Sequence, residues 1–327
     1  MTAVLVVVDH DRGTIAAASL GAVTAGRALA RQTGGALHAV TIGAGADALA
    51  GILAAHGATM VHQVHHAALV DYGPEAWGES LATVVRALSP AVVLGCGTER
   101  GHEVVAQAAA RLDAPAAMNC TEFDDSFTGT GPLKVVRARW GGSLMEQAEV
   151  DAEVRFVTLA NHVVEPSESP VAVATTVHDV TLPDSVLHSF VRDRVERTAG
   201  VTLATAPVVV SGGRGVGSAE AFAPLEELAS LLGGVVGCSR AVTNNGWRNH
   251  ADQVGQTGTR IAPDVYIACG ISGAIQHWVG AMASKNIIAI NTDKDANIVT
   301  KAGYAVIGDL HKVVPAISAE IRRRRGS

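Results

Sequence analysis

The sequence predicts an α/β protein of two domains: an N-terminal parallel-sheet domain followed by a C-terminal, doubly wound domain. Three observations support this prediction. The chain has 327 residues, more than a single typical core accommodates. Valine-rich runs of strand length alternate with longer helical patterns, as right-handed βαβ crossovers require. The composition is 48% hydrophobic but only 4% aromatic, which is typical of closely packed parallel strands under helices.

In the first half, continuous apolar runs predict buried strands, and apolar residues at helical spacing predict helices that end at glycine or proline. The strands are predicted at 3–10, 36–43, 59–66 and 91–97, and the helices at 14–35, 46–57, 73–90 and 101–115. From about Asn119 the pattern changes to extended segments at 133–150 and 152–160, joined by a Gly-Gly turn. The segment 166–185 is rich in proline and serine and predicts either an edge strand or a linker.

A proline before a new strong strand places the domain boundary near residue 196, giving domains of 1–195 and 196–327. The second half then restarts the alternation of strands and helices. Its strands are predicted at 206–212, 235–240, 262–270, 286–293 and 303–310, and its helices at 219–234, 272–284 and 311–325.

Composition and charge exclude several classes of protein. The formal charge of −6 gives no basic face for nucleic acid, and the run Arg322–Arg325 suits a solvated helix end. The four cysteines form no CxxC motif and indicate no disulfide framework. The first residues lack the basic region of a signal peptide, and no apolar run is long enough to span a bilayer. We therefore expect a cytoplasmic protein.

The predicted strands of the second half share one feature, because small and polar residues follow each of them. In parallel sheets the carboxyl ends of the strands meet at one edge, and ligands bind there. One such cluster could arise by chance, but five predict a ligand site. The clusters are Ser211–Gly215, Cys238–Arg240, Ile271–Ala274, Asn291–Lys294 and Asp309–Leu310.

The chemistry of these clusters favours a phosphate-containing ligand. The glycines at 211–215 allow close backbone approach, and Arg214 supplies a cation. This run matches neither the dinucleotide fingerprint nor a P-loop, so a plain tight turn is an equal alternative. Ser272 and Gly273, at a predicted helix start, would form a second anion site.

Metal and nucleophile chemistry are both disfavoured. The run HQVHH at 62–66 resembles a metal cluster, but no Cys, Asp or Glu stands beside it in sequence. His277 lies on a predicted helix near the ligand site, which makes it a candidate ligand contact. The alternative is that it is an ordinary histidine on the helix surface. No GxSxG motif occurs, and no cysteine has a histidine close in sequence. We therefore expect a bound cofactor to carry the reactivity.

Six segments together resemble the alpha (large) subunit family of electron transfer flavoproteins. They are VVVSGGRG at 208–215, GCSRAV at 237–242, QVGQTG at 253–258, YIACGISGAIQHWVG at 266–280, IIAINTDKDANI at 287–298 and YAVIGDLHKVVP at 304–315. The resemblance is specific over about 205–318 and weaker before it. The loop 244–252 departs from the family pattern, which has a proline after its aromatic residue.

The resemblance implies a noncovalently bound FAD and a heterodimer, in which residues 1–195 pack on a beta subunit. It also implies electron transfer from acyl-CoA dehydrogenases in fatty acid oxidation, or related donors, to a membrane-associated quinone reductase. The residues that match the family's FAD contacts are Arg214, Ser239, Arg240, Val254, Gly255, Gln256, Thr257, Ser272, Gly273, Ala274, Ile275, Gln276, His277, Asn291, Asp309 and Leu310.

Physical roles follow for some of these residues. Reduction places negative charge on the flavin N1–C2=O edge, where Arg240 or His277 would stabilise it. The Thr257 hydroxyl would contact flavin N5, and Gln256 the ribityl chain. Gln253 would only brace its loop.

Some residues of the predicted site have other possible roles, and the sequence leaves alternative functions open. Arg214 suits either the ring or the phosphates, and Asn291 and Asp309 suit the adenosine end. The alternatives for function are the alpha subunit of an electron-bifurcating complex and an NAD-dependent enzyme on a related domain. A nucleotide sensor in the first half ranks last, because no glycine-rich loop follows its first strand.

Overall fold

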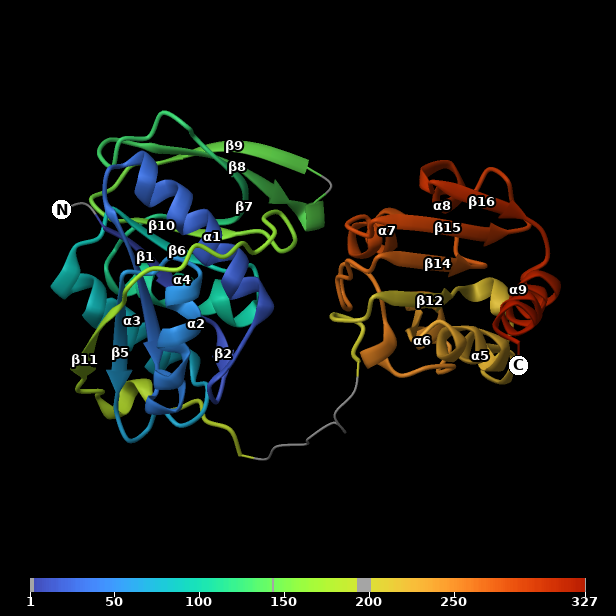
Figure 1. The fold of residues 1–327 in the computed structure, drawn as a ribbon, viewed down its shortest axis with the longest axis horizontal. Helices are drawn as coiled ribbons and strands as arrows, with labels where there is room; N and C mark the ends of the chain where they lie inside the picture. Colours follow the sequence, from blue (N-terminus) through green and yellow to red (C-terminus); the bar gives the residue numbers. More distant parts are fainter. Residues whose placement is uncertain (1–2, 143, 193–200, 327) are drawn as a thin grey trace. The chain divides into compact units, whose positions relative to one another are not determined.

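The computed structural model describes residues 3–142, 144–192 and 201–326 (Figure 1). Residues 3–140 and 144–192 form one compact unit, the N-terminal domain, and residues 201–326 form a second, the C-terminal domain. The predicted boundary near residue 196 lies outside the described residues. Both domains are α/β, with a large and largely parallel sheet in the first and a smaller parallel sheet in the second.

The N-terminal sheet has nine strands within the described residues, in the order β11-β5-β4-β1-β6-β10-β7-β8-β9. All neighbouring strands from β11 to β7 are parallel, and β8 and β9 extend the sheet as an antiparallel hairpin. The bounds are β1 (Ala3–Val7), β4 (Ala36–Ile42), β5 (Met60–His65), β6 (Val92–Gly95), β7 (Ala116–Phe123), β8 (Leu133–Arg139), β9 (Leu144–Val150), β10 (Arg155–Leu159) and β11 (Ala174–Asp179).

Helices cover both faces of this sheet. One core cluster joins the sheet to α1 (Ala17–Gln32) and α2 (Ala50–Ala55), and another joins it to α3 (Pro74–Leu88) and α4 (Glu99–Arg111). Central strands such as β1 are therefore apolar on both faces, which explains their continuous valine runs. The short strands β2 (His10–Asp11) and β3 (Thr14–Ile15) form a small separate hairpin.

One segment of this domain was not predicted from the sequence, and a second decides between two alternatives that the sequence left open. Strand β7 was not predicted, because its sequence AAMNCTEF mixes small, polar and apolar residues without a clear period. The proline- and serine-rich segment contains the edge strand β11, whose residues are mostly exposed. Since only one neighbour pairs with an edge strand, it tolerates this polar composition.

The C-terminal sheet has the order β13-β12-β14-β15-β16, and all its pairs are parallel. Helices α5 and α9 pack on one face, and α7 and α8 on the other. The bounds are β12 (Val208–Gly212), α5 (Ala223–Leu231), β13 (Val235–Cys238), α6 (Arg240–Asn244), β14 (Val265–Cys269), α7 (Ile275–Ala281), β15 (Asn286–Asn291), α8 (Asn297–Lys301), β16 (Tyr304–Ile307) and α9 (Leu310–Arg325). This is the doubly wound arrangement that the sequence predicts.

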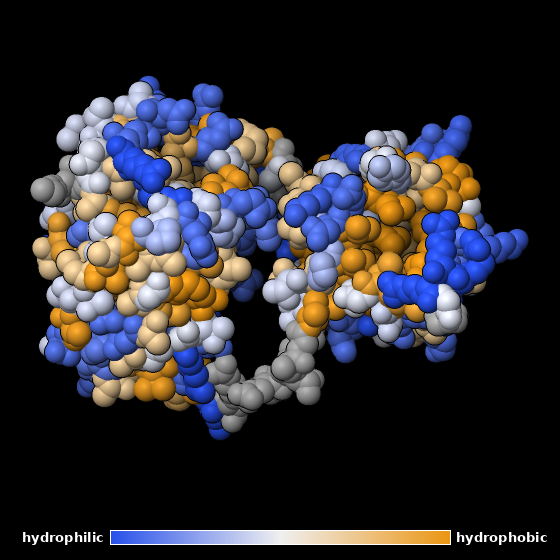
Figure 2. Space-filling model, viewed as in Figure 1, coloured by the Kyte–Doolittle hydropathy of each residue, from blue (hydrophilic) through white to orange (hydrophobic). Residues whose placement is uncertain are grey.

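Charged helix ends and exposed apolar side chains mark the surface. The arginine run ends α9, where Arg322 pairs with Glu227 of α5. Figure 2 shows apolar surface interspersed with hydrophilic residues on both domains. The exposed apolar side chains include Leu144 and Met145 of β9 and Tyr304 of β16. No helix among the described residues is long and apolar enough to cross a membrane.

Candidate functional site

The strand order of the C-terminal domain places a ligand crevice between β12 and β14. The chain runs from β12 outward to β13, then returns past β12 to β14 and continues to β15 and β16. At such a reversal, the loops that follow the two central strands diverge to opposite faces of the sheet. Ligands of doubly wound sheets bind in the crevice that this divergence opens at the carboxyl ends of the strands.

A cavity of about 380 Å³ lies at this position. Its lining comes from the loops after four neighbouring strands: Arg214, Gly215, Ser239, Ala241, Gly270, Ser272, Asn291, Asp293 and Ala296. Four of the predicted site residues therefore meet here: Arg214, Ser239, Ser272 and Asn291. Ala241 and Asp293 were not among the predicted site residues, although Asp293 belongs to a strand-end cluster noted in the sequence.

The glycines of the 211–215 loop serve a different purpose from the one predicted. The Gly213 and Gly215 amides donate to the carbonyls of Cys269 and Gly270, at 2.8 and 3.1 Å. A Cβ atom on Gly213 would overlap the Gly270 carbonyl. Glycine is therefore needed here to let two protein loops approach each other, and these two amides are not available to a phosphate.

The side chains that line this cavity, rather than the Gly213 and Gly215 amides, suit a bound anion. Among the described residues, the Arg214 guanidinium has no ion-pair partner, and the Ser239 and Ser272 hydroxyls make no hydrogen bond. An unpaired cation with two free hydroxyls fits a phosphate or pyrophosphate group. Arg240, exposed at the start of α6, is a second unpaired cation within the described part of the chain.

The 253–258 loop joins the end of β13 to the start of α7. The Val254 amide donates to the Cys238 carbonyl, and the Gln256 amide donates to the Gln276 carbonyl. Gln253 is buried, and its side chain bonds both Thr243 and Thr257, so it braces the loop as predicted. Gln256 and Thr257 are exposed at the loop tip, where a ligand could reach them.

His277 is a buried residue, so the alternative of a helix-surface histidine is wrong. It is 7% exposed, and its Nε2 lies 2.7 Å from the Tyr266 hydroxyl. Its Nδ1 is buried without a hydrogen-bond partner among the described residues. Burial lowers the pKa of His277 to about 4, and the Val254 carbonyl opposes this shift. The imidazole is therefore neutral at neutral pH.

The other predicted site residues differ in how they can meet a ligand. Ser272, Ala274, Ile275 and Gln276 are exposed around the start of α7, whereas Gly255 and Gly273 are buried. The Val254 and Leu310 side chains belong to the core, so a ligand would meet only their backbone.

Two predicted adenosine contacts already bond to protein. The Asn291 side chain donates to the Ile271 carbonyl and accepts from the Asp293 amide. Asp309 caps α9 by accepting from the His311 amide. Both side chains therefore hold the geometry of the strand ends.

The loop 244–252, which departs from the family pattern, is held by Arg248. Its guanidinium bonds Glu226 of α5 at 2.6 Å and Asp252 at 3.1 Å, and it lies over the Phe222 ring. These contacts anchor the approach to the 253–258 loop without the proline that the family pattern has.

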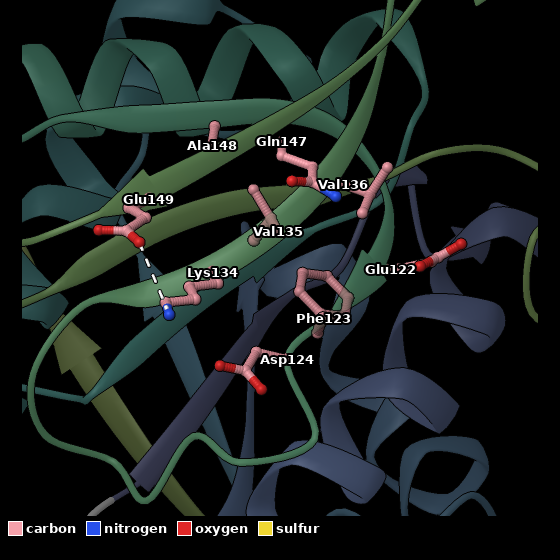
Figure 3. A pocket seen from close by; sticks show the side chains of 9 residues that line it. All are labelled: Glu122, Phe123, Asp124, Lys134, Val135, Val136, Gln147, Ala148 and Glu149. Atoms are coloured by element: carbon pink, nitrogen blue, oxygen red, sulfur yellow. Dashed lines mark ion pairs between the residues drawn. The ribbon is translucent and has the colours of Figure 1, made fainter.

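A larger cavity, of about 530 Å³, lies on β7, β8 and β9 of the N-terminal domain (Figure 3). Among the described residues that line it, Lys134 is the one cation, and it pairs with Glu149 at 3.8 Å; Glu122 and Asp124 add further carboxylates. No predicted site residue lies in it. The cavity of the C-terminal domain, with its unpaired arginine, is better suited to a phosphate ligand.

Two histidines of the 62–66 run bond to other side chains, and the third, His66, accepts from the Ala68 amide. His62 lies between His38 and His178, at 3.0 and 2.9 Å, and His65 bonds Asp47. Within the described residues, no group of three or more His, Cys, Asp or Glu side chains is placed to hold a metal ion.

Comparison with known proteins identifies the family. Residues 4–185 match the electron transfer flavoprotein domain, and residues 202–282 match the electron transfer flavoprotein FAD-binding domain. The chain belongs to the electron transfer flavoprotein alpha-subunit family. Its C-terminal domain is accordingly an FAD-binding domain.

Relatives of this family match nearly the whole chain. The electron transfer flavoprotein subunit alpha of Mycobacterium tuberculosis is 36% identical, with 100% of each chain covered. That of Bacillus subtilis is 33% identical, with 98% of this chain and 97% of the relative covered. The protein FixB of Bradyrhizobium diazoefficiens is 35% identical, with 98% and 89% covered.

The described residues fit FAD in two respects. The unpaired Arg214 and the free hydroxyls of Ser239 and Ser272 suit its pyrophosphate. At the 253–258 loop, the buried Nδ1 of His277 is a polar atom without a protein partner, as a ligand-binding group would be. When bound, FAD supplies the capacity to accept and donate electrons, and the protein supplies its binding and electrostatic surroundings.

Proposed function

We propose that this chain is the FAD-binding subunit of a heterodimeric electron carrier. It takes electrons from flavoprotein dehydrogenases of the acyl-CoA type and passes them to a quinone reductase or another acceptor. The observation that carries the proposal is the crevice between β12 and β14, where Arg214, Ser239 and Ser272 offer unpaired groups to a pyrophosphate. The family's FAD-binding domain supports the same assignment.

Within this proposal, the predicted residues divide between the two ends of FAD. The cavity residues Arg214, Ser239 and Ser272 hold the phosphates. The 253–258 loop and His277 face the flavin, with Thr257 at N5 and Gln256 at the ribityl chain. Arg240 supplies positive charge that stabilises the reduced flavin.

A beta subunit as partner is supported by apolar surface on the N-terminal domain. Leu144 and Met145, at the start of β9, are 55% and 56% exposed, and Trp140, directly after β8, is 76% exposed. Large apolar side chains gathered on one hairpin suit a protein interface. We propose that residues 1–195 pack on the beta subunit and 196–327 form the FAD-binding domain.

Co-expression with a beta subunit of the family tests this function. We expect a yellow heterodimer that contains FAD and is reduced by an acyl-CoA dehydrogenase with its substrate. Arg214→Ala should weaken FAD binding, while Arg324→Ala, at the far end of α9, should not. A colourless protein that binds NAD would contradict the proposal. One flavin per heterodimer would indicate simple transfer, and two would indicate bifurcation.

A further inference from the structure

Tyr266 is a buried tyrosine that contacts His277. It lies on β14, is 0% exposed, and packs in the same core cluster as Ile261 and Ile298. Its hydroxyl shares a hydrogen bond of 2.7 Å with His277 Nε2. A phenylalanine would fill the same space without burying a polar group, so packing alone does not explain the hydroxyl.

The surroundings of His277 determine which ring nitrogen carries the proton. The neutral imidazole has one N–H donor and one acceptor nitrogen. A backbone acceptor, the Val254 carbonyl, acts on this imidazole and opposes the fall in its pKa. Since Tyr266 occupies Nε2, the nitrogen left to face the carbonyl is Nδ1. An acceptor on that side favours the tautomer with the proton on Nδ1 and the lone pair on Nε2, although the contact is not a hydrogen bond of ordinary geometry.

The Tyr266 hydroxyl suits the donor role that this arrangement requires. Burial raises the pKa of Tyr266, so the phenol keeps its proton. The fully buried Ser211 hydroxyl partly opposes that shift, as a donor beside the phenol oxygen does, although it makes no hydrogen bond of ordinary geometry. Because Ser211 acts as a donor towards the phenol oxygen, the phenol proton is left to point to Nε2 of His277.

We infer that Tyr266 is a positioning residue for His277: its hydroxyl donates to Nε2, fixes the ring orientation and keeps the ring proton on Nδ1. This inference rests on the proposed placement of His277 at the flavin. Nδ1 makes no hydrogen bond of ordinary geometry with any described residue, so its proton is left for a ligand. A donor there stabilises the negative charge of a reduced flavin, so Tyr266 raises the flavin potential without touching FAD.

Tyr266→Phe in the full heterodimer tests the inference with two readouts. The ¹⁵N chemical shifts of His277 report its tautomer, and a redox titration reports the flavin potential. We expect FAD to stay bound, the single Nδ1–H tautomer to become a mixture, and the potential to fall. Tyr304→Phe is the matched control, because that tyrosine is 66% exposed on β16, and it should change neither readout.

A double-mutant cycle separates positioning from a merely structural effect. In a His277→Asn background, Tyr266→Phe should shift the potential no further. A shift that persists there, or an unchanged His277 tautomer in Tyr266→Phe, would overturn the inference. If Tyr266→Phe fails to fold, Ser211→Ala should shift the potential in the same direction by a smaller amount, and no shift would count against the inference. Absence of FAD from the wild-type heterodimer would instead contradict the proposed function.

Discussion

The Gln253 side-chain amide donates a hydrogen bond to the Thr257 hydroxyl over 2.9 Å. Gln253 is buried and Thr257 is exposed, so this contact ties the base of the 253–258 loop to its tip. Because the Thr257 oxygen accepts from Gln253, its own proton is free for another acceptor. The loop therefore presents a hydroxyl donor whose position is fixed from inside the protein.

Thr257→Ala should leave FAD bound and lower the flavin potential. In the proposed arrangement, the substitution removes one hydrogen bond from Thr257 to the flavin, and this bond is stronger when the flavin carries negative charge. Its loss is worth about 1 kcal/mol, or roughly 40 mV for a one-electron couple. Thr257→Ser keeps the hydroxyl and should retain the wild-type potential. Redox titration of both variants checks this result. If alanine abolishes FAD binding, Thr257 holds the loop and does not tune the flavin.

Arg240→Ala should also lower the flavin potential, by tens of millivolts. The guanidinium is exposed at the start of α6 and has no ion-pair partner within the described residues, and in the proposed function its charge acts on the flavin. Removing a cation disfavours the negatively charged, reduced flavin. A redox titration at low and high salt measures the effect, which salt should weaken. Arg324→Ala is the control, and an equal shift in both variants would contradict a local role for Arg240.

The sequence predicts the site's location better than its internal contacts. Four of the five polar clusters after predicted strands, such as 211–215, line one cavity, because parallel topology brings strand ends together. Tyr266 could not be predicted as a functional residue. It lies within an apolar strand run, where an aromatic side chain indicates core packing, and its hydroxyl contact with His277 depends on how α7 packs on β14.

The parts of the fold that the sequence did not predict are short or depend on distant partners. Helices α6 and α8 have five residues each, too few for a helical period to show. The contact between Gly255 and Gly280 joins positions far apart in sequence, and each glycine alone indicates only a break in regular structure. Such contacts become visible only when the 253–258 loop is placed against α7.

Gly280→Ala should displace the 253–258 loop and weaken FAD binding. A Cβ atom on Gly280 would overlap the Gly255 backbone, so the loop or α7 must shift. Overpacking of this kind costs about 1–3 kcal/mol of stability. Urea unfolding and FAD titration of the full chain measure both effects. Gly51→Ala is the control, since a Cβ there meets nothing within 4 Å. Wild-type FAD affinity in Gly280→Ala would show that the loop position is unimportant.

Acidification should destabilise the N-terminal domain through His62. Burial, with smaller contributions from His38 and His178, lowers the pKa of His62 from 6.5 to about 4. As pH falls from about 6.5 towards 4, the unfolded chain therefore gains a proton that the folded chain does not. The free energy of unfolding decreases in that window, by about 1–2 kcal/mol once solvent screening is allowed for. It is retained above pH 6.5.

The pH dependence of urea unfolding checks this sign. The wild type should lose stability across the window from pH 6.5 to about 4, and His62→Gln should lose less. Glutamine keeps a side chain that can donate to one neighbouring imidazole and accept from the other, but it does not titrate. His277, with a pKa of about 4, contributes the same sign in the C-terminal domain, so some slope should persist in the variant. A slope identical to that of the wild type would assign the acid sensitivity to groups other than His62.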